Sequence, residues 1–187
     1  TECSLIEENG RAHFLTKRFD RENGRKLHMQ TLCGMAHYDF RLKNGHSYEQ
    51  AFNVMRRLRL PYSQAQEMFR RIVFNVVVRN QDDHTKNISF LMDSSGQWGL
   101  SPAYDMGFAY NPLGAWTGTH QMSINGKFDN ITRADLLSLA NANNIKNASE
   151  IIDQVSETTA GWPELAKNCG VPQKMIDEIL PHLLLKI

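Results

Sequence analysis

Apolar residues recur at helical spacing through the middle of the chain. The run over residues 65–80 carries a wide apolar stripe on one face, which predicts a helix at the centre of the fold. Ser47 followed by Gln50 is the signature of a capping box and predicts a preceding helix that Pro61 ends. Ser63 followed by Gln66 predicts the same kind of start for the central helix. The stripe consists of Met68, Phe69, Ile72, Val73, Val76 and Val77.

Shorter patterns before this region predict β-structure and a further helix. Residues 1–20 predict short strands joined by a hairpin turn at residues 8–10, where Asn is followed by Gly. Met29, Leu32 and Ala36 stand at i, i+3 and i+7, which predicts a helix over residues 26–38.

The remainder of the chain alternates between turns and helical patterns. Two short apolar runs surround residues 93–96 and predict a β-hairpin. Residues 102–130 are rich in Gly, Pro and Asn and predict a long loop, which in a compact domain is usually functional. Thr132 predicts an N-cap, and Asn147 with Glu150 predicts a capping box, for helices of the last third. The predicted fold class is therefore α+β and mostly α.

The overall composition narrows the classes of protein. A length of 187 residues with 41% hydrophobic content suffices for one large domain or two small ones. With 21 basic and 20 acidic residues, the net charge of +1 gives no reason to expect a nucleic acid or an anionic membrane as partner. No apolar run approaches the roughly 20 residues of a membrane helix, and the first residues lack the pattern of a secretory signal.

The cysteines indicate a reducing compartment. Cys3, Cys33 and Cys169 are odd in number and widely spaced, which fits neither a disulfide framework nor a zinc module. The pattern predicts free, buried thiols and a cytoplasmic protein.

A dense polar cluster directly follows the central stripe. Residues 79–89 read RNQDDHTKNIS. Asp82 and Asn87 stand five residues apart, the spacing of a phosphoryl-transfer loop in which the Asp accepts a proton and the Asn oxygen holds a metal. Asp105 begins an Asp-x-Gly after the predicted hairpin, where protein kinases carry a metal-binding Asp. Such a set supplies the hard oxygen ligands that Mg²⁺ prefers and a separate carboxylate for the acceptor hydroxyl.

Two further side chains of this loop have candidate roles. Lys86 would place an ammonium group against the transferring phosphate. His84 would brace the loop through its two ring nitrogens.

The same residues also allow other interpretations. The Asp-x4-Asn spacing occurs by chance in many proteins. Asp82 and Asp83 also suit an ordinary turn or helix end. A metal-dependent phosphoesterase or nuclease would use Asp82, Asp83, His84 and Asp105 around one or two metals. A non-catalytic interaction domain would keep the fold without turnover.

Five segments within about residues 14–125 carry a resemblance to a known family. They are KRFDR (17–21), LHMQTLCG (27–34), SYEQAFNVMRRL (47–58), NQDDHTKNISF (80–90) and LSPAYDM (100–106). In this order they resemble the HipA family, bacterial serine/threonine kinases that are the toxins of toxin–antitoxin modules, and the Asp-x-His-x-Lys-Asn loop and the Ser/Thr-Pro-x-Tyr-Asp segment are the most specific motifs. The resemblance implies a protein-kinase-like C-terminal lobe, in which a small β-hairpin carries the active site, and ATP- and Mg²⁺-dependent phosphorylation of a protein serine or threonine.

The resemblance implies a role for individual residues. Asp82 matches the catalytic base, and Asn87 and Asp105 match the metal ligands. The hinge segment, whose backbone holds the adenine, matches Lys17, Arg18 and Phe19. The ATP site of the family further matches His84, Thr85, Lys86, Asn87, Tyr104 and Asp105.

The resemblance also implies a domain division and partners. Residues 1–20 match a remnant of the N-terminal lobe with the hinge, and residues 21–187 match the helical C-terminal lobe. The phosphate-gripping loop and the ATP-contacting lysine of the family lie upstream of the hinge, so the isolated chain is expected to bind ATP poorly and to be inactive. The implied partners are a HipB-like DNA-binding antitoxin, through which DNA would be met only indirectly, and a protein substrate from translation, such as an aminoacyl-tRNA synthetase.

Three other groups of residues have a functional and a structural interpretation. His120 and Lys127 follow the metal motif and belong either to a substrate-facing loop or to a plain ordered loop. An arginine cluster is either a solvated helix face or a docking surface for an acidic partner or DNA. Trp98, Trp116 and Trp162 are expected to be packing residues. The arginine cluster comprises Arg56, Arg57, Arg59, Arg70 and Arg71.

Overall fold

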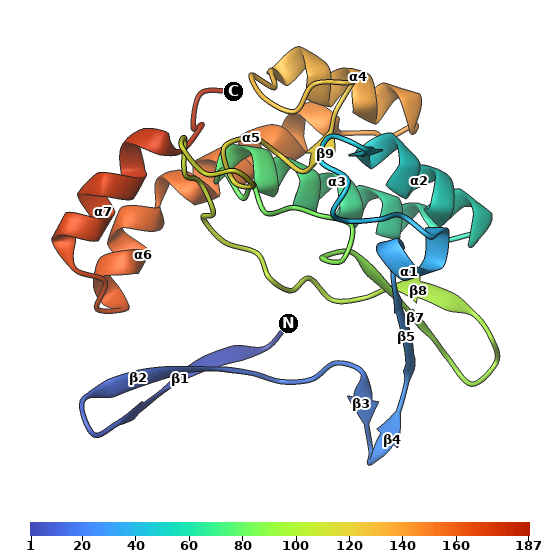
Figure 1. Cartoon of the computed structure of the whole chain (residues 1–187), viewed down its shortest axis with the longest axis horizontal. Helices are drawn as coiled ribbons and strands as arrows, with labels where there is room; N and C mark the ends of the chain where they lie inside the picture. The colour runs from blue at the N-terminus through green and yellow to red at the C-terminus, as the bar shows by residue number, and fades with distance from the viewer.

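The fold combines seven α-helices with four small β-structures, and the computed structural model describes it over residues 1–187 (Figure 1). The larger helices lie together on one side of the molecule, while the β1–β2 and β3–β4 hairpins lie apart from them (Figure 1). The helices are α1 (Leu32–Ala36), α2 (Tyr48–Arg57), α3 (Tyr62–Val77), α4 (Arg133–Ala142), α5 (Ala148–Ala160), α6 (Trp162–Asn168) and α7 (Gln173–Ile179), followed by the 3-10 helix η1 (Leu180–His182).

The strands form four separate pairs or sheets. β5, β7 and β8 make a three-stranded antiparallel sheet with β7 at its centre. β1 pairs with β2 and β3 with β4, both antiparallel, and β6 pairs with β9 in parallel. The strands are β1 (Cys3–Glu8), β2 (Arg11–Thr16), β3 (Arg21–Glu22), β4 (Arg25–Lys26), β5 (His28–Thr31), β6 (His46–Ser47), β7 (Ser89–Met92), β8 (Trp98–Leu100) and β9 (Met122–Ser123).

The start of α2 is the capping box that its sequence predicts. The Gln50 backbone N–H donates to Ser47 Oγ at 3.3 Å, and the Ser47 backbone N–H donates to Gln50 Oε1 at 2.9 Å. Two of the donors that a helix start leaves without partners are thereby satisfied. The box predicted for α3 at Ser63 is wrong, because α3 begins at Tyr62 with Pro61 as an N-cap that makes no side-chain hydrogen bond. Proline presets φ for a helix start, so Pro61 begins α3 instead of ending α2.

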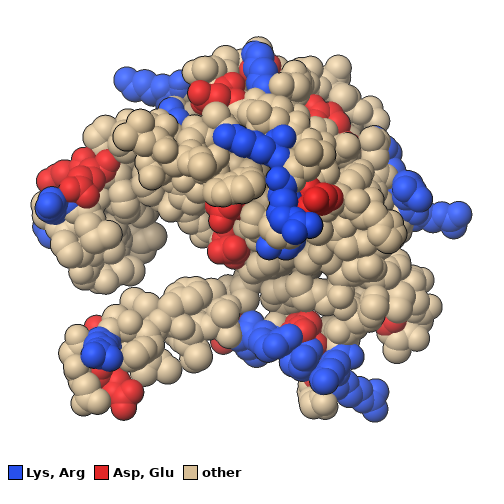
Figure 2. All heavy atoms as spheres, viewed as in Figure 1, with Lys and Arg blue, Asp and Glu red and all other residues tan.

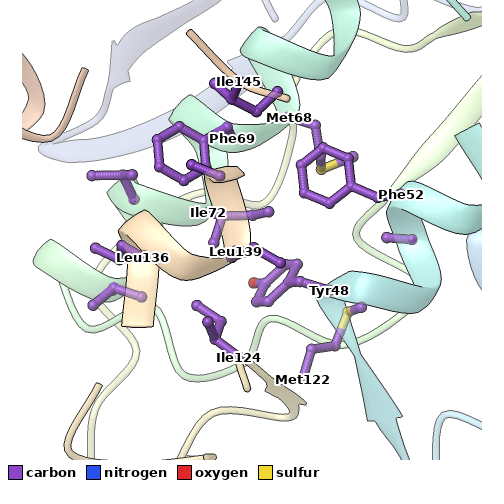
Figure 3. Close-up of a cluster of buried hydrophobic side chains, with 14 of the residues drawn as sticks. Tyr48, Phe52, Met68, Phe69, Ile72, Met122, Ile124, Leu136, Leu139 and Ile145 are labelled. Atoms are coloured by element: carbon purple, nitrogen blue, oxygen red, sulfur yellow. The ribbon is translucent and has the colours of Figure 1, made fainter. Parts of the chain in front are cut away.

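The apolar stripe of α3 is the centre of the hydrophobic core. All six of its predicted residues are buried, which confirms the prediction of a central helix. Figure 3 shows Phe69 and Ile72 of this stripe beside Leu136 and Leu139 of α4, with Tyr48 of α2 close by. α3 also packs along α5. The polar residues that follow α3 are therefore attached to the most deeply buried element of the fold.

Both predicted hairpins are confirmed. Asn9 and Gly10 have φ of 51° and 73°, the left-handed backbone that a two-residue hairpin turn between β1 and β2 requires. In the β7–β8 turn, Asp93 Oδ1 accepts from the backbone N–H groups of Ser95 at 2.8 Å and Gln97 at 3.0 Å. Both turns depend on residues that are close together in sequence, which explains why both can be predicted from sequence.

The helix predicted over residues 26–38 is wrong in its first half. His28–Thr31 forms strand β5, which pairs antiparallel with β7, and only Leu32–Ala36 is helical. The partner strand lies about 60 residues away in sequence, so a window of helical spacing does not detect it. The pair β6–β9 is likewise absent from the predictions, and β9 falls inside the loop predicted over residues 102–130.

The caps of the last third follow their predictions in part. Thr132 caps α4 and shares a capping box with Asp135, as predicted at Thr132. Asn147 is the N-cap of α5, but its backbone is left-handed with φ of 58° and its side chain makes no cap hydrogen bond. The box predicted between Asn147 and Glu150 is therefore wrong.

The exposure of single residues corrects two expectations. The three cysteines are free, as predicted, but Cys3 and Cys169 are exposed and only Cys33 is partly buried. Trp98 packs against the core, whereas Trp116 is exposed, so the packing role predicted for Trp116 is wrong. No helix is long and apolar enough to cross a membrane.

Replacing Asp135 with asparagine is expected to reduce the acid sensitivity of the fold. Burial alone raises the pKa of Asp135, but hydrogen bonds from Lys127 and Thr132 outweigh burial and hold the pKa well below its usual range. Such a carboxyl contributes stability in full above its unfolded value of about 4, and the contribution is lost as the pH falls through the folded value. Urea unfolding at about pH 7 and about pH 3 should show a smaller loss of unfolding free energy in Asp135→Asn than in the wild type.

Asp177→Asn in α7 is the matched control, because that carboxylate is exposed. It should lose as much stability on acidification as the wild type. An equal acid loss in Asp135→Asn and the wild type would contradict the prediction.

Candidate functional site

A cleft of about 710 Å³ lies between the β1–β2 hairpin and residues 103–109, which include Asp105. Figure 2 shows the molecule hollowed between the hairpin, at the lower left, and the helical body. The hairpin side is lined by Thr1, Cys3, Phe14 and Thr16. The body side is lined by Asn80, Asp82, Asn87 and residues 103–109. The structure thus brings Asp82, Asn87, Tyr104 and Asp105 to one cleft.

Backbone hydrogen bonds hold the two polar segments of the cleft side by side. The chain leaves α3 through Arg79, which is left-handed with φ of 53°. The Gln81 N–H donates to the Ala109 carbonyl, and the Ala109 N–H donates to the Arg79 carbonyl, both at 3.1 Å. These bonds join residues 79–81 to residue 109, and they explain why Asp105 lies near Asp82 although 23 residues separate the two in sequence.

Asp82 and Asn87 are fixed relative to each other within the loop. The Asn87 backbone N–H donates to the His84 carbonyl at 2.9 Å, and Asn87 Nδ2 donates to the Asp82 carbonyl at 3.0 Å. The amide nitrogen of Asn87 is therefore engaged, and its Oδ1 makes no hydrogen bond. The Asp82 side chain is 49% exposed, and its Oδ1 lies 3.9 Å from His84 Nε2. Both side chains present oxygen acceptors to the cleft.

Asp105 adopts a backbone conformation that is uncommon for residues other than glycine. Its φ is 54°, in the left-handed region that Asp and Asn tolerate better than most residues. Asn80 Nδ2 donates to the Asp105 carbonyl at 3.4 Å, while the carboxylate is exposed and makes no hydrogen bond or ion pair. Such conformations cluster at active sites, although turn residues such as Asn9 and Asn125 share this one here.

Tyr104 connects the floor of the cleft to the hinge segment. Its Oη donates to the Lys86 carbonyl at 2.5 Å, and its ring lies 5.7 Å from the Phe19 ring, centroid to centroid. Burial raises the pKa of the Tyr104 phenol, so this group remains a hydrogen-bond donor at neutral pH. Tyr104 thereby ties the loop of Asn87 to the segment that the resemblance assigns to adenine binding.

The predicted hinge residues lie beside the cleft and not in its lining. Lys17, Arg18 and Phe19 line an adjacent open hollow of about 380 Å³. Lys17 Nζ pairs with Glu2 at 3.0 Å, and Arg18 pairs with Asp20 at 2.6 Å. The hydrogen bond from Arg18 lowers the pKa of Asp20 to about 2.

Three further predicted ATP-site residues, besides the hinge residues, lie outside the 710 Å³ cleft. Lys86 Nζ rests 3.6 Å from the centroid of the Phe40 ring, and the His84 ring lies 6.0 Å from the same ring. Thr85 is buried, and its Oγ1 has no hydrogen-bond partner. The loop thus directs Asp82 and Asn87 to the cleft, and Lys86 and His84 to Phe40.

The set of residues suggested for a metal-dependent phosphoesterase is not assembled. Asp83 is buried, and its carboxylate accepts hydrogen bonds from Tyr48 Oη at 2.6 Å and from the Gln121 N–H at 2.7 Å. No group of three or more His, Cys, Asp or Glu side chains is placed to hold one metal ion. The structure gives this alternative no specific support.

The structure does not support a substrate-facing role for His120 and Lys127, in the loop after the metal motif. His120 was a candidate for facing substrate, but its side chain is 4% exposed and its Nδ1 lies 2.8 Å from Asp83 Oδ2. Lys127 Nζ pairs with Asp135 at 2.8 Å. Both residues therefore follow the structural interpretation of an ordered loop.

The arginine cluster has the contacts of a helix surface. Arg71 bonds Glu67 at 2.8 Å, Arg70 bonds Gln154 at 2.9 Å, and Arg56 bonds Asn143 at 2.6 Å. Arg57 and Arg59 are exposed. These neighbours satisfy much of the cluster, as the solvated-face interpretation expects.

The oxygen donors of the cleft are of the chemical type that Mg²⁺ prefers. Mg²⁺ is usually held by one or two carboxylates, with waters and phosphate oxygens completing its shell. The free Asp105 carboxylate and the free Asn87 Oδ1 provide such hard donors at the same cleft.

The sequence reasoning overlooked two residues of this region, Asn75 and Asn80. Both are buried, and Asn80 Nδ2 donates to Asn75 Oδ1 at 2.9 Å. The available signal was an amide, Asn75, inside the otherwise apolar stripe of the central helix, because buried polar groups require partners.

Comparisons with known proteins bear on the family and the fold of the chain. A family model described as HipA-like C-terminal domain matches residues 1–162. The protein named "Putative kinase Y4mE" of Sinorhizobium fredii (strain NBRC 101917 / NGR234) is 27% identical over an alignment of 108 positions, and the match covers 52% of this chain and 26% of that protein. The Shewanella oneidensis MR-1 structure of a toxin–antitoxin system, with HipA, HipB and operator DNA, superposes with a TM-score of 0.67 at 20% identity. That match covers 97% of this chain and 45% of the other, so this chain spans less than half of either relative.

Proposed function

Since the chain belongs to the family of HipA-like C-terminal domains, we propose that it carries the catalytic residues of a serine/threonine protein kinase. The proposed reaction transfers the γ-phosphoryl group of ATP to a protein serine or threonine. The observation that supports it most is that Asp82, Asn87 and Asp105 line one cleft. These are the residue types that phosphoryl transfer requires, at the order and spacing of a kinase catalytic loop and metal motif.

In this proposal Asp82 orients the acceptor hydroxyl and accepts its proton. Its carboxylate is half exposed in the cleft and forms no close ion pair, so it is accessible to an incoming hydroxyl. A general base must come within hydrogen-bond reach of the proton that it removes. Because Asn87 Nδ2 holds the Asp82 carbonyl, the backbone beneath the base is fixed.

Asn87 and Asp105 would hold Mg²⁺ through their side-chain oxygens. When bound, Mg²⁺ neutralises charge on the phosphate oxygens and orients them for transfer. The Asn80 bond to the Asp105 carbonyl and the bond from Asn87 Nδ2 to the Asp82 carbonyl preset both ligands. Little reorganisation is then needed when the site fills.

The nucleotide would lie along the cleft, with its adenine toward the hinge. The backbone of Lys17–Phe19 would hold the adenine, and the contact of Phe19 with Tyr104 places this segment next to the cleft. Lys86 would steady the phosphates only after leaving Phe40, and His84 and Thr85 would shape the loop from behind. Residues 1–20 would then belong to the N-terminal lobe and residues 21–187 to a kinase-like C-terminal lobe whose β7–β8 hairpin separates the two site segments.

The biological setting is proposed by similarity. The Shewanella HipA structure contains HipB and operator DNA. By analogy, a HipB-like antitoxin would bind the natural protein that contains this chain, and both would be in the cytoplasm. The antitoxin, and not this chain, would contact DNA. The phosphorylated protein would be a component of translation, such as an aminoacyl-tRNA synthetase.

A phosphotransfer assay tests the proposal. The natural protein that contains the chain would be incubated with Mg²⁺, γ-labelled ATP and bacterial lysate proteins, and phosphoserine and phosphothreonine would be measured. We expect label on protein only when both ATP and Mg²⁺ are present. Hydrolysis of a phosphodiester with Mg²⁺ alone would favour the phosphoesterase alternative. Absence of turnover, with partner binding unchanged when Asp82 and Asp105 are both replaced by alanine, would favour the interaction domain.

A further inference from the structure

Asp83, the neighbour of the proposed base, has a set of partners that the kinase motif does not require. Its side chain is 1% exposed, whereas that of Asp82 is 49% exposed. Asp83 Oδ2 is the common partner of Tyr48 Oη at 2.6 Å and His120 Nδ1 at 2.8 Å, and Asp83 Oδ1 accepts from the Gln121 N–H at 2.7 Å. Adjacent carboxylates therefore point to opposite environments, one to the cleft and one to the interior.

The partners of Asp83 come from separate parts of the fold. Tyr48 belongs to α2, and Figure 3 shows it within the buried cluster beside the α4 residue Leu139. His120 and Gln121 belong to the segment that leads into β9. A buried carboxylate is expensive unless every oxygen is hydrogen-bonded, so the loop is restrained from two directions at the residue next to Asp82.

The same network continues to the other side of the cleft. Tyr48 Oη accepts from Asn75 Nδ2 at 3.0 Å, and Asn75 Oδ1 accepts from Asn80 Nδ2 at 2.9 Å. Asn80 Nδ2 also lies 3.4 Å from the Asp105 carbonyl. A continuous chain of side-chain hydrogen bonds thus runs beneath the cleft from the neighbour of Asp82 to the backbone of Asp105. Burial and the adjacent Asp83 carboxylate raise the pKa of Tyr48 well above its usual value, so its hydroxyl remains a donor.

Packing alone does not account for this arrangement. An apolar side chain at position 83 would fill the same interior without the cost of a buried charge. The hydrogen bonds also fix the position and orientation of the loop relative to α2, α3 and the 120–121 segment. Displacement of a reacting group by about 1 Å can reduce a rate by about 10²-fold.

We propose that Asp83 is a positioning residue, which sets Asp82 against the metal ligands by anchoring the loop to Tyr48, His120 and the backbone of Gln121. This inference rests on the proposed kinase function for its kinetic test. It assigns no contact with substrate to Asp83. It adds the 120–121 segment to the elements that determine the geometry of the site.

The main test is Asp83→Asn in the natural protein that contains the chain. Asparagine keeps the size of the side chain but presents an N–H₂ group to donors, so at least one anchoring bond is lost. We expect kcat for phosphotransfer to fall about 10-fold to 10²-fold, while KM for ATP changes by less than about 2-fold. Amide hydrogen exchange should become faster in residues 80–87 and stay unchanged in α4 and α5. Asp177→Asn on α7 is the matched control and should leave both measurements unchanged.

Tyr48→Phe is a second, milder variant in case Asp83→Asn folds poorly. It removes one donor to Asp83 and retains the buried ring, so it should shift kcat and local exchange in the same direction by a smaller factor. A kcat within about 2-fold of the wild type in both variants would overturn the proposal. Faster exchange throughout the chain, with kcat falling only in proportion to the folded fraction, would also overturn it, because Asp83 would then be merely structural.

The two proposals can fail separately. If the wild type shows no phosphotransfer, the proposed function fails, and hydrogen exchange alone decides the role of Asp83. Faster exchange confined to residues 80–87 would still support anchoring of the loop, and unchanged exchange there would refute it. If the wild type is active and both Asp83→Asn and Tyr48→Phe are equally active, the kinase proposal stands and the positioning role is refuted.

Discussion

Replacing Asp82 with asparagine is expected to reduce kcat for phosphotransfer by about 10²–10⁴-fold, the usual contribution of a positioned general base. Asparagine has nearly the same shape but does not accept a proton at neutral pH. The Asp82 carboxylate makes no hydrogen bond within the protein, and Asn87 bonds only its backbone carbonyl. The substitution should therefore leave the thermal midpoint within about 2 °C of the wild type. Initial rates with Mg²⁺ and ATP, together with a thermal melt, measure both effects.

The control for this prediction is a carboxylate-to-amide change remote from the cleft. Asp177→Asn removes one exposed charge from α7 and should retain the wild-type rate. If Asp82→Asn also retains the wild-type rate, Asp82 is not the base, and the assignment of the loop is wrong.

Replacing Asp105 with asparagine should reduce phosphotransfer by about 10²-fold or more, because stabilisation of transition-state charge by a metal is worth several kcal/mol. The carboxylate is the only charged oxygen donor among the proposed ligands, so its loss should also raise the Mg²⁺ concentration needed for half-maximal rate. Asparagine tolerates the left-handed backbone that Asp105 adopts at φ of 54°. A Mg²⁺ titration of the rate, at saturating ATP, is the measurement.

Asp105→Ala separates the charge from the backbone conformation. The left-handed conformation is less favourable for alanine than for asparagine, by about 1 kcal/mol. Asp105→Ala should therefore lower the unfolding free energy more than Asp105→Asn does. Both variants should lose activity to a similar extent. A rate and Mg²⁺ dependence equal to those of the wild type in Asp105→Asn would remove Asp105 from the metal site.

Local sequence signals predicted the elements that local bonds create. The capping box at Ser47, the N-cap at Thr132 and the turn at Asn9-Gly10 each depend on residues within a few positions of one another. The apolar stripe of α3 also follows from spacing alone, because burial of one helical face produces it. These features can be derived from a single sequence.

Pairings between distant segments could not be predicted in the same way. The strand β5 has helical spacing, and it is a strand because β7 supplies its hydrogen-bond partners. β6 and β9 have two residues each and pair across more than 70 positions. No local pattern encodes such a pair, so tertiary contacts override the propensity of the segment.

The candidate site shows the same division. The spacing of Asp82 and Asn87 suggested a shared role, and the loop bond between them is local. The position of Asp105 depends on the backbone bonds of Ala109 with Arg79 and Gln81, which no sequence pattern reveals. The orientation of Lys86 toward Phe40 also depends on a distant segment. The sequence therefore indicated the candidate site residues, while the tertiary fold determines which of them line the cleft.

The central claim is that side-chain oxygens of Asn87 and Asp105 hold one magnesium ion, with Asp82 facing the same nucleotide. The most direct test is a crystal of the natural protein with Mn²⁺ and a non-hydrolysable ATP analogue, in which anomalous diffraction locates the metal. The account predicts a peak within direct coordination distance, roughly 2 Å, of an oxygen of Asp105 and of Asn87 Oδ1. A nucleotide-bound metal coordinated elsewhere, with neither residue as a ligand, would contradict it.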